Sequence, residues 1–460
     1  MSTESAPIVA PAIVLPIRPR GQLLRILGVG FGLATAVGNT IGQGILRQPG
    51  EVASHLSNVT WIYSVWLLGG VYAILCSSTV SELGATLPEA GGWYVYSKRA
   101  FGEYAGFAVG CCDWIMQCVA IASLSLASAD FLVQLFPVFI SRHNLAGATL
   151  LGILALLNWI GLRSGSFTQK LTSLAKTIAL LGLIGACFFV TSQVPAIGTG
   201  PSSRIFHHHE SLLLGLLLSA QAVISAYDGW YAPIYFAEED QNPRVNLPRA
   251  TMGGAATCIV LYLLMNAALL HVLPFIQLQA SQVPAADAAM AVLGRYGRVF
   301  ILLLSLLTAL RCANATILCT PRILFALARD RLLPATVTTV NQGGTPTYAL
   351  LMVVLPSIAL ILAGTFDSLI AIVSILYVSV YASGFASLLV LRRREPNLPR
   401  PYRAWWYPWS TIAVLVVSLT FLVAAVLGDL KHSLFTLILA ALTFPAYQVI
   451  RKQRVRSTIA

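Results

Sequence analysis

The chain has 460 residues, of which 57% are hydrophobic and only 10% are charged, against about 25% charged residues in an ordinary soluble domain. This composition excludes a soluble globular protein. The 29 Lys and Arg residues exceed the 17 Asp and Glu residues by 12, and their distribution, given below, indicates membrane topology rather than nucleic-acid binding. The eight cysteines lie in apolar segments without a CxxC pair or a histidine at metal-ligand spacing, so we expect no disulfide framework, metal site or cofactor.

Twelve apolar segments of about membrane-spanning length follow one another along residues 23–451. Residues 1–22 carry prolines and lack the basic-then-apolar order of a signal peptide, so we expect a disordered cytoplasmic tail there. A second cytoplasmic tail is expected at 452–460. The third and eighth segments are long enough to be tilted helices that extend past the bilayer. The twelve segments lie at 26–46, 61–81, 104–136, 146–162, 171–191, 212–236, 251–273, 296–327, 347–364, 369–391, 407–427 and 433–450.

The basic residues predict the orientation of these segments. With the N-terminus in the cytoplasm, 21 of the 29 basic residues fall in cytoplasmic loops and tails, and five fall outside. The positive-inside rule therefore predicts a multi-pass protein of the plasma membrane with both termini in the cytoplasm.

Two of the segments are interrupted at their centres. The first contains GNTIGQGI (38–45), with three glycines in seven positions, and the sixth contains SAYDGWYAP (225–233), with an acidic residue followed by glycine. Glycine weakens a helix by about 1 kcal/mol relative to alanine, and a central carboxylate costs about 2.5–3.5 kcal/mol on insertion scales. Interruptions at corresponding places in two halves of a chain are typical of transporters that bind substrate at the membrane midplane. Close helix packing is the alternative explanation for the three glycines.

Such interruptions suit a zwitterion such as an amino acid. The N-terminus of a half-helix presents free N–H groups to a carboxylate, and the C-terminus of a half-helix presents free carbonyls to an ammonium group.

Five segments resemble motifs of the amino acid–polyamine–organocation (APC) superfamily of permeases, in particular its L-type amino acid transporter branch. They occur in the family's order: AVGNTIGQGIL (36–46), LPEAGGWYVYSKRAFGE (87–103), AYDGWYAPIYFAEEDQNPRVNLPRA (226–250), NATILCTPRILFALARDRLLP (314–334) and LRRREPNLPRPYRAWWYP (391–408).

This resemblance implies an all-α membrane protein of twelve transmembrane helices with a LeuT-like fold. Helices one to five (23–192) and six to ten (211–394) would be inverted repeats with broken helices one and six, and helices eleven and twelve (405–451) would be appended. It also implies transport of amino acids by alternating access, often as obligatory exchange.

The resemblance extends to individual residues of the binding site. Gly42, Gln43 and Gly44 match positions whose N–H groups hold the substrate carboxylate. The positions whose carbonyls receive the amine are matched by Thr40 on the first helix and by Ser225 and Asp228 on the sixth.

The chain departs from the family pattern in three places. Gln43 replaces a serine and is large enough to narrow the site or add a hydrogen bond. Ser225 replaces a gating aromatic, which leaves occlusion to another group such as Tyr227 or Trp230. The outer loop PVFISRHN (137–144) lacks the cysteine that links metazoan members to a heavy subunit, so we expect no covalent partner. The expected partners are the amino acid and membrane lipid.

Two charged residues on the fifth and sixth helices each have two interpretations. Asp228 could accept a cationic substrate side chain, or it could cap the broken helix. Lys176 matches the family's lysine on helix five, where sodium-coupled relatives of the fold place an ion, and therefore implies sodium-independent transport; Thr316 matches a small hydroxyl residue near it. The ammonium of Lys176 would hold helix five to the unwound part of helix one, where burial could link transport to protons. It could instead extend to the cytoplasmic interface.

Further charges lie on or next to the eighth and sixth helices. We predict that Arg311, too deep to reach the interface, forms an ion pair with an aspartate, with substrate contact as the alternative. The candidate aspartates are Asp113, Asp130 and Asp228. Glu238 and Glu239 follow the sixth helix near Arg244 and Arg249, and are expected to form a gating or loop-ordering charge network.

The histidines do not suggest chemistry. The run at 207–209 is expected to be a solvated loop, and His271 an interfacial residue. We find no cluster with nucleophile–base or metal spacing at membrane depth and no repeated filter sequence, so an enzyme and a channel are disfavoured. The sequence predicts a secondary transporter, either an exchanger or a proton-coupled carrier of cationic amino acids or polyamines.

Overall fold

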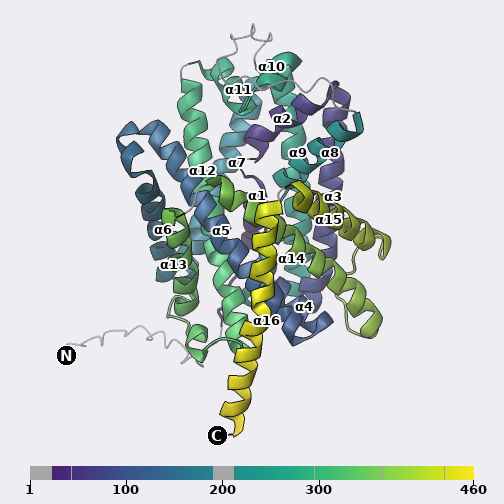
Figure 1. Cartoon of the computed structure of the whole chain (residues 1–460). Coiled ribbons are helices and arrows are strands. Elements are labelled where there is room, and N and C mark those ends of the chain that lie inside the picture. The colour runs from purple at the N-terminus through teal and green to yellow at the C-terminus, as the bar shows by residue number, and fades with distance from the viewer. Residues whose placement is uncertain are drawn as a thin grey trace, which may run out of the picture.

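The computed structural model describes residues 23–42, 44–189, 212–294, 296–363, 366–428 and 430–459, and within these ranges the protein is helical, with no β-strand (Figure 1). The predicted N-terminal tail lies outside the described residues.

Three short 3-10 helices (η) lie among the α-helices of the described chain. Their order is α1 (Val29–Thr40), α2 (Gly44–His55), α3 (Val59–Thr86), α4 (Trp93–Phe101), α5 (Glu103–Leu135), η1 (Pro137–Arg142), α6 (His143–Ile160), α7 (Leu162–Phe188), α8 (Leu212–Ala226), η2 (Ala232–Glu239), α9 (Pro243–Val272), α10 (Phe275–Ala280), α11 (Pro284–Leu293), α12 (Tyr296–Arg329), η3 (Ala335–Thr338), α13 (Thr347–Ala363), α14 (Phe366–Arg394), α15 (Trp409–Gly428) and α16 (Leu430–Ile459).

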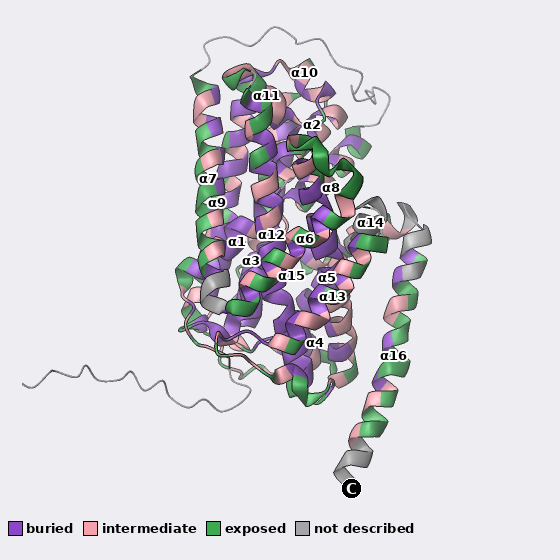
Figure 2. Cartoon of the chain, turned by 90° about the vertical axis from the view of Figure 1, so that its left-hand side faces the viewer, coloured by how far each residue is buried: buried purple, intermediate pink, exposed green. Residues whose placement is uncertain are grey.

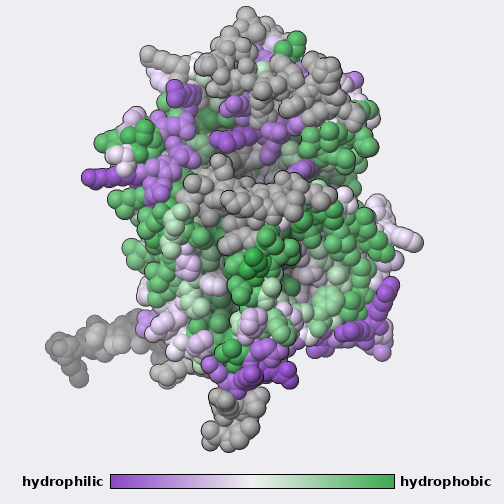
Figure 3. Space-filling view, in the orientation of Figure 1, coloured by the Kyte–Doolittle hydropathy of each residue, from purple (hydrophilic) through white to green (hydrophobic). Residues whose placement is uncertain are grey.

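Eight of the described helices are long and apolar enough to cross a membrane. The two long segments predicted from the sequence are confirmed as α5, with 33 residues, and α12, with 34. Three further apolar helices, α8, α11 and α13, have 10 to 17 residues. On the face shown in Figure 3, apolar side chains cover the middle of the molecule and polar side chains gather toward its two ends, as a membrane protein requires. The complete set of twelve crossings stays a prediction.

Helices α5 and α12 pack against each other at the centre of the bundle. In their most apolar stretches 67% and 78% of the residues are buried, whereas the corresponding value for α6 and α15 is 22% (Figure 2). The buried face of α5 consists largely of Gly, Ala, Ser and Cys, which let neighbouring helices approach closely. A central helix pair surrounded by more exposed helices is the result.

Both ends of the described chain lie at the same end of the bundle. The backbone of Leu27 bonds to that of Glu239 and Gln241, at 3.0 and 2.9 Å. Arg454 near the other terminus contacts Glu103 at 2.5 Å, at the start of α5. The C-terminal part of α16 extends from this end, which is the lower end in Figure 1. An even number of membrane crossings would place both ends of the chain on the same side in this way.

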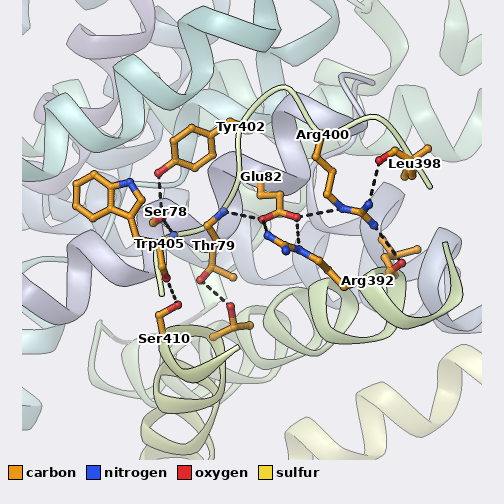
Figure 4. A network of polar contacts seen from close by, with 12 residues as sticks. Ser78, Thr79, Glu82, Arg392, Leu398, Arg400, Tyr402, Trp405 and Ser410 are labelled. Atoms are coloured by element: carbon orange, nitrogen blue, oxygen red, sulfur yellow. Dashed lines mark hydrogen bonds and ion pairs between the residues drawn. The ribbon is translucent and has the colours of Figure 1, made fainter. Parts of the chain in front are cut away.

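A buried carboxylate on α3 fastens the segment that joins α14 to α15 (Figure 4). Glu82, whose side chain is 1% exposed, accepts hydrogen bonds from Arg392 Nε and Nη2 at 2.7 and 2.6 Å, and lies 3.2 Å from Arg400 Nε. The backbone N–H of Ala404 donates to the same carboxylate at 2.7 Å. One turn earlier, Ser78 accepts the N–H of Trp405 at 2.9 Å. The linker is therefore ordered by α3 rather than by its own hydrogen bonds alone.

We expect Glu82→Gln to destabilise the protein much more than Glu395→Gln. Glu395 also pairs with an arginine, Arg99, at 2.8 Å, but the arginine side chain is 54% exposed. Breaking a buried pair costs about 3–5 kcal/mol, whereas an exposed pair contributes about 0–1 kcal/mol. Thermal unfolding of both variants in detergent tests this; equal unfolding temperatures would show that the Glu82 network does not order the linker.

Candidate functional site

The first predicted interruption is confirmed as a break between α1 and α2. Helix α1 ends at Thr40, and α2 begins at Gly44. The N–H of Gly42 donates to the carbonyl of Thr40 at 2.7 Å, in a tight turn. A new helix, α2, thus begins in the interior of the protein, and its first N–H groups have no partner within the helix. Gln43 lies outside the described residues.

The second predicted interruption is confirmed between α8 and η2. Helix α8 ends at Ala226, and the chain resumes as a 3-10 helix at Ala232. Gly229 between them has a φ of +111°, and a Cβ atom there would lie 2.6–2.7 Å from the backbone of Asn39 and Thr40. Only glycine permits both this backbone conformation and this approach. The two breaks are therefore in direct backbone contact.

Tyr262 of α9 joins the carboxyl ends of the two broken helices. Its hydroxyl lies 2.7 Å from the carbonyl oxygen of Thr40 and 2.9 Å from that of Ala226. Carbonyls at a helix C-terminus lack intrahelical donors, and the single O–H donor of this buried tyrosine is shared between one such carbonyl from each break. The sequence analysis missed Tyr262, because nothing in the pattern of α9 distinguishes it from an ordinary core tyrosine.

A cavity of about 430 Å³ lies at the meeting point of the breaks, within the size range of sites for small ligands. The unpredicted residues around it include Tyr72 of α3, Ser123 of α5 and Tyr377 and Tyr381 of α14. Eight residues predicted from the sequence line it: Thr40, Gly42, Gly44, Ser225, Tyr227, Asp228, Trp230 and Thr316. The predicted residues Lys176, Arg311, Glu238 and Glu239 lie outside this lining.

An aromatic cluster packs beside the cavity around Asp228. The Tyr381 hydroxyl donates to Asp228 Oδ1 at 2.8 Å. The ring of Tyr381 lies 5.3 Å from that of Trp93 and 6.0 Å from that of Trp230. Asp228 therefore lines the cavity and at the same time joins the second break to α14.

Lys176 extends to the first break and not to the membrane interface. Its side chain is 1% exposed, and its ammonium donates to the carbonyl of Gly38 at 2.9 Å and to that of Ile41. The interpretation that this lysine reaches the cytoplasmic surface is therefore wrong. Helix α7 is held to the unwound end of α1, as the alternative interpretation requires.

The predicted ion pair of Arg311 is wrong. Its guanidinium is buried and donates from Nη2 to the carbonyl of Ala34 at 2.7 Å, and no carboxylate of the described residues pairs with it. Arg311 projects toward α1, whose C-terminal end carries partial negative charge. The three candidate aspartates have other partners: Asp113 bonds to Tyr235, Asp130 to His143 and Asp228 to Tyr381.

Glu238 and Glu239 form a charge network, but with other arginines than predicted. Glu239 accepts two hydrogen bonds of 3.0 Å from Arg322, and both side chains are at most 1% exposed. Glu238 pairs with Arg329 at 2.7 Å. Both arginines belong to α12, whereas the predicted partners Arg244 and Arg249 are exposed on α9. The network fastens η2 to α12 at the end of the bundle that holds both chain ends.

The histidines contribute nothing to this site. The run at 207–209 lies outside the described residues. His271 packs against the ring of Phe188 at 5.6 Å near the C-terminal end of α9. Among the residues that the structure describes, no group of His, Cys, Asp and Glu could hold a metal ion.

A helical membrane protein with a cavity between two broken helices has the architecture of a membrane transporter. The chain belongs to the amino acid permease family of the APC superfamily, whose model matches residues 23–444. It is 26% identical over 440 residues to the serine/threonine exchanger SteT of Bacillus subtilis, covering 94% of this chain and 98% of that protein. It is 28% identical to the mouse Asc-type amino acid transporter 1, covering 84% of this chain and 73% of that protein. The mouse b(0,+)-type amino acid transporter 1 is 26% identical, with 89% and 84% covered. The protein is a transporter and not an enzyme.

The guanidinium of Arg311 packs directly against Gly38, where any side chain would collide with it. A Cβ atom at Gly38 would lie 1.7 Å from Arg311 Cζ. Gly38→Ala should therefore lower the free energy of unfolding by about 1–3 kcal/mol, as overpacking does, and thermal unfolding in detergent should show this loss. Combining it with Arg311→Ala should recover part of the loss. Gly30→Ala on the same helix is the control, because its Cβ would meet nothing within 4 Å. Equal tolerance of both alanines would contradict the contact.

Proposed function

We propose that the protein carries amino acids across the plasma membrane by sodium-independent exchange, with alternating access to the cavity between the two breaks. One observation supports this most strongly: the backbone of Gly229 lies against that of Asn39 and Thr40. The first turn of α2 and the last turns of α1 and α8 thereby meet at one cavity. An N–H-rich helix start and carbonyl-rich helix ends are the groups that a zwitterion needs.

The substrate carboxylate would bind at Gly44, where α2 begins beside the cavity. The N–H of Gly42 is bonded to Thr40 and would have to exchange that partner for the substrate. The amine would bind near the end of α8 at Ser225, with Thr40 and Asp228 beside it. Tyr227 and Trp230 would occlude the bound amino acid, since both line the same cavity.

Sodium independence is supported by the position of Lys176. Its ammonium already donates to carbonyls at the end of α1, where a cation would otherwise stabilise the partial negative charge of the helix end. Exchange is supported by the similarity to SteT, a serine/threonine exchanger. Another relative is named as the small subunit of a large neutral amino acid transporter, but we propose that this chain acts without a covalent partner, because residues 137–144 contain no cysteine.

Proton-coupled uptake of cationic amino acids or polyamines is the second candidate function. The observation that favours it is the carboxylate of Asp228 in the cavity lining. A carboxylate there could pair with a substrate ammonium or guanidinium. Glu238 and Glu239 would act as a gate in either case, since they fasten η2 to α12.

Counterflow in proteoliposomes tests the proposed function. Vesicles that contain the purified protein are preloaded with one unlabelled amino acid at a time, and entry of the same labelled amino acid is followed with and without sodium. We expect saturable, stereoselective entry that is accelerated by internal amino acid and does not change when potassium replaces sodium. Entry that needs sodium, or no counterflow with any of the twenty amino acids, would contradict the proposal.

Asp228→Asn separates the two roles of that carboxylate. If Asp228 pairs with a cationic substrate, the variant should lose uptake of lysine, arginine and ornithine at least about tenfold, because one charge-assisted hydrogen bond contributes about 1.5–3 kcal/mol. Uptake of neutral amino acids by the same variant is the internal control. An equal loss for both classes would assign Asp228 to the structure of the break.

A further inference from the structure

Asp113 is a carboxyl group that neither the cavity nor the charge networks account for. It lies on α5, ten residues after Glu103 and so about 15 Å along the helix, and it is 0% exposed. An ionised carboxylate at such a position is costly unless it is paired. Ionisable residues inside membrane proteins commonly mark ion or proton pathways.

The hydrogen bonds of Asp113 come from two neutral groups. The hydroxyl of Tyr235 lies 2.9 Å from both carboxyl oxygens, and Gln117 Nε2 donates to Oδ1 at 3.3 Å. An ionised carboxylate has about four acceptor sites and no donor, whereas a protonated carboxyl can itself donate to a hydroxyl oxygen. The two donors favour the ionised form, whereas burial without a cationic partner favours the protonated form, so the site can hold Asp113 in either state.

No cationic side chain of the described residues pairs with Asp113. The ionisable groups in its surroundings include Cys112 on its own helix, the hydroxyl of Tyr235 on η2, the thiol of Cys319 on α12 and the hydroxyl of Tyr377 on α14. All four are uncharged in their protonated forms. An asparagine could make the same two hydrogen bonds without any charge to bury, so the ability to bind and release a proton is what distinguishes the carboxyl group.

Tyr235 belongs to the segment that follows the second break. Helix η2 contains Tyr235 and ends at Glu239, which is fastened to Arg322. If η2 moves relative to α5 during alternating access, the contact between Tyr235 and Asp113 breaks and the carboxyl group gains access to water. Protonation of Asp113 and the position of η2 are then energetically coupled.

Aromatic side chains connect this pair to the cavity. The ring of Tyr235 lies 6.1 Å from that of Tyr231, which lies 5.1 Å from that of Tyr381. The hydroxyl of Tyr381 donates to Asp228 in the cavity wall. A change in the cavity can therefore reach Tyr235 through packed side chains.

We propose that Asp113 is a proton-binding site that couples proton movement to amino acid transport, with Tyr235 as its positioning residue. This inference rests on the proposed transport function. When η2 is displaced, a proton from water adds to a carboxylate oxygen of Asp113. When η2 returns, the new O–H group donates to Tyr235, and the proton leaves by way of the cavity when the cavity opens to the opposite side of the membrane.

Asp113→Asn in proteoliposomes tests the proposal, because asparagine keeps the shape and the hydrogen bonds but cannot release a proton. The probe is each amino acid that shows counterflow, with an inside-alkaline pH gradient imposed and the membrane potential clamped. The wild type should accumulate amino acid, up to about tenfold per pH unit for one proton each, and should acidify the lumen as reported by a trapped pH-sensitive dye. Asp113→Asn should keep counterflow and lose both effects.

Asp130→Asn is the matched control, because it changes an aspartate of the same helix whose side chain is 52% exposed; it should retain accumulation and acidification. Gradient-driven accumulation by Asp113→Asn equal to that of the wild type would overturn the proposal. So would wild-type counterflow without any substrate-dependent acidification, a result that needs no variant and leaves amino acid exchange intact. Absence of counterflow in the wild type would instead overturn the proposed function itself.

Discussion

Backbone groups that have lost their helical partners are the constraint on which this structure depends. Two helices end in the interior, at Thr40 and Ala226, and their last carbonyls have no donors within the helix. In a hydrocarbon environment each unsatisfied group would cost several kcal/mol. The hydroxyl of Tyr262 and the ammonium of Lys176 supply donors at these ends. The remaining exposed groups border the cavity, where a substrate can bind them.

The buried charges are accommodated in three different ways. Glu239 and Arg322 pair with each other in a bidentate geometry. Lys176 and Arg311 donate to backbone carbonyls of the α1 region instead of to carboxylates. Asp113 accepts hydrogen bonds from neutral groups only. The first arrangement fixes elements to each other, whereas the latter two place ionisable groups beside segments that would move in the proposed alternating access.

The glycine pattern was sufficient to locate both breaks, because backbone conformation is a local property. Gly229 adopts a φ of +111°, which few other residues tolerate, and Asp228 before it cannot sit in an uninterrupted apolar helix without cost. Side-chain partners could not be predicted in the same way. The sequence predicts an ion pair between Arg311 and an aspartate, but its guanidinium donates to a backbone carbonyl. Glu238 and Glu239 pair with arginines of α12 rather than with the arginines nearest in sequence. A rotation of a helix about its axis by one residue turns a side chain by about 100°, and the sequence does not specify that rotation.

The sequence by itself determined that the protein is a helical membrane protein, that two of its helices are interrupted, and which motifs it shares with amino acid permeases. These properties follow from hydropathy, from glycine and from residues close together in the chain. Only the tertiary structure decided that the two interruptions touch, that Tyr262 serves both helix ends and that Asp113 faces Tyr235 of η2. Each of these contacts joins residues far apart in sequence, and packing of whole helices brings them together.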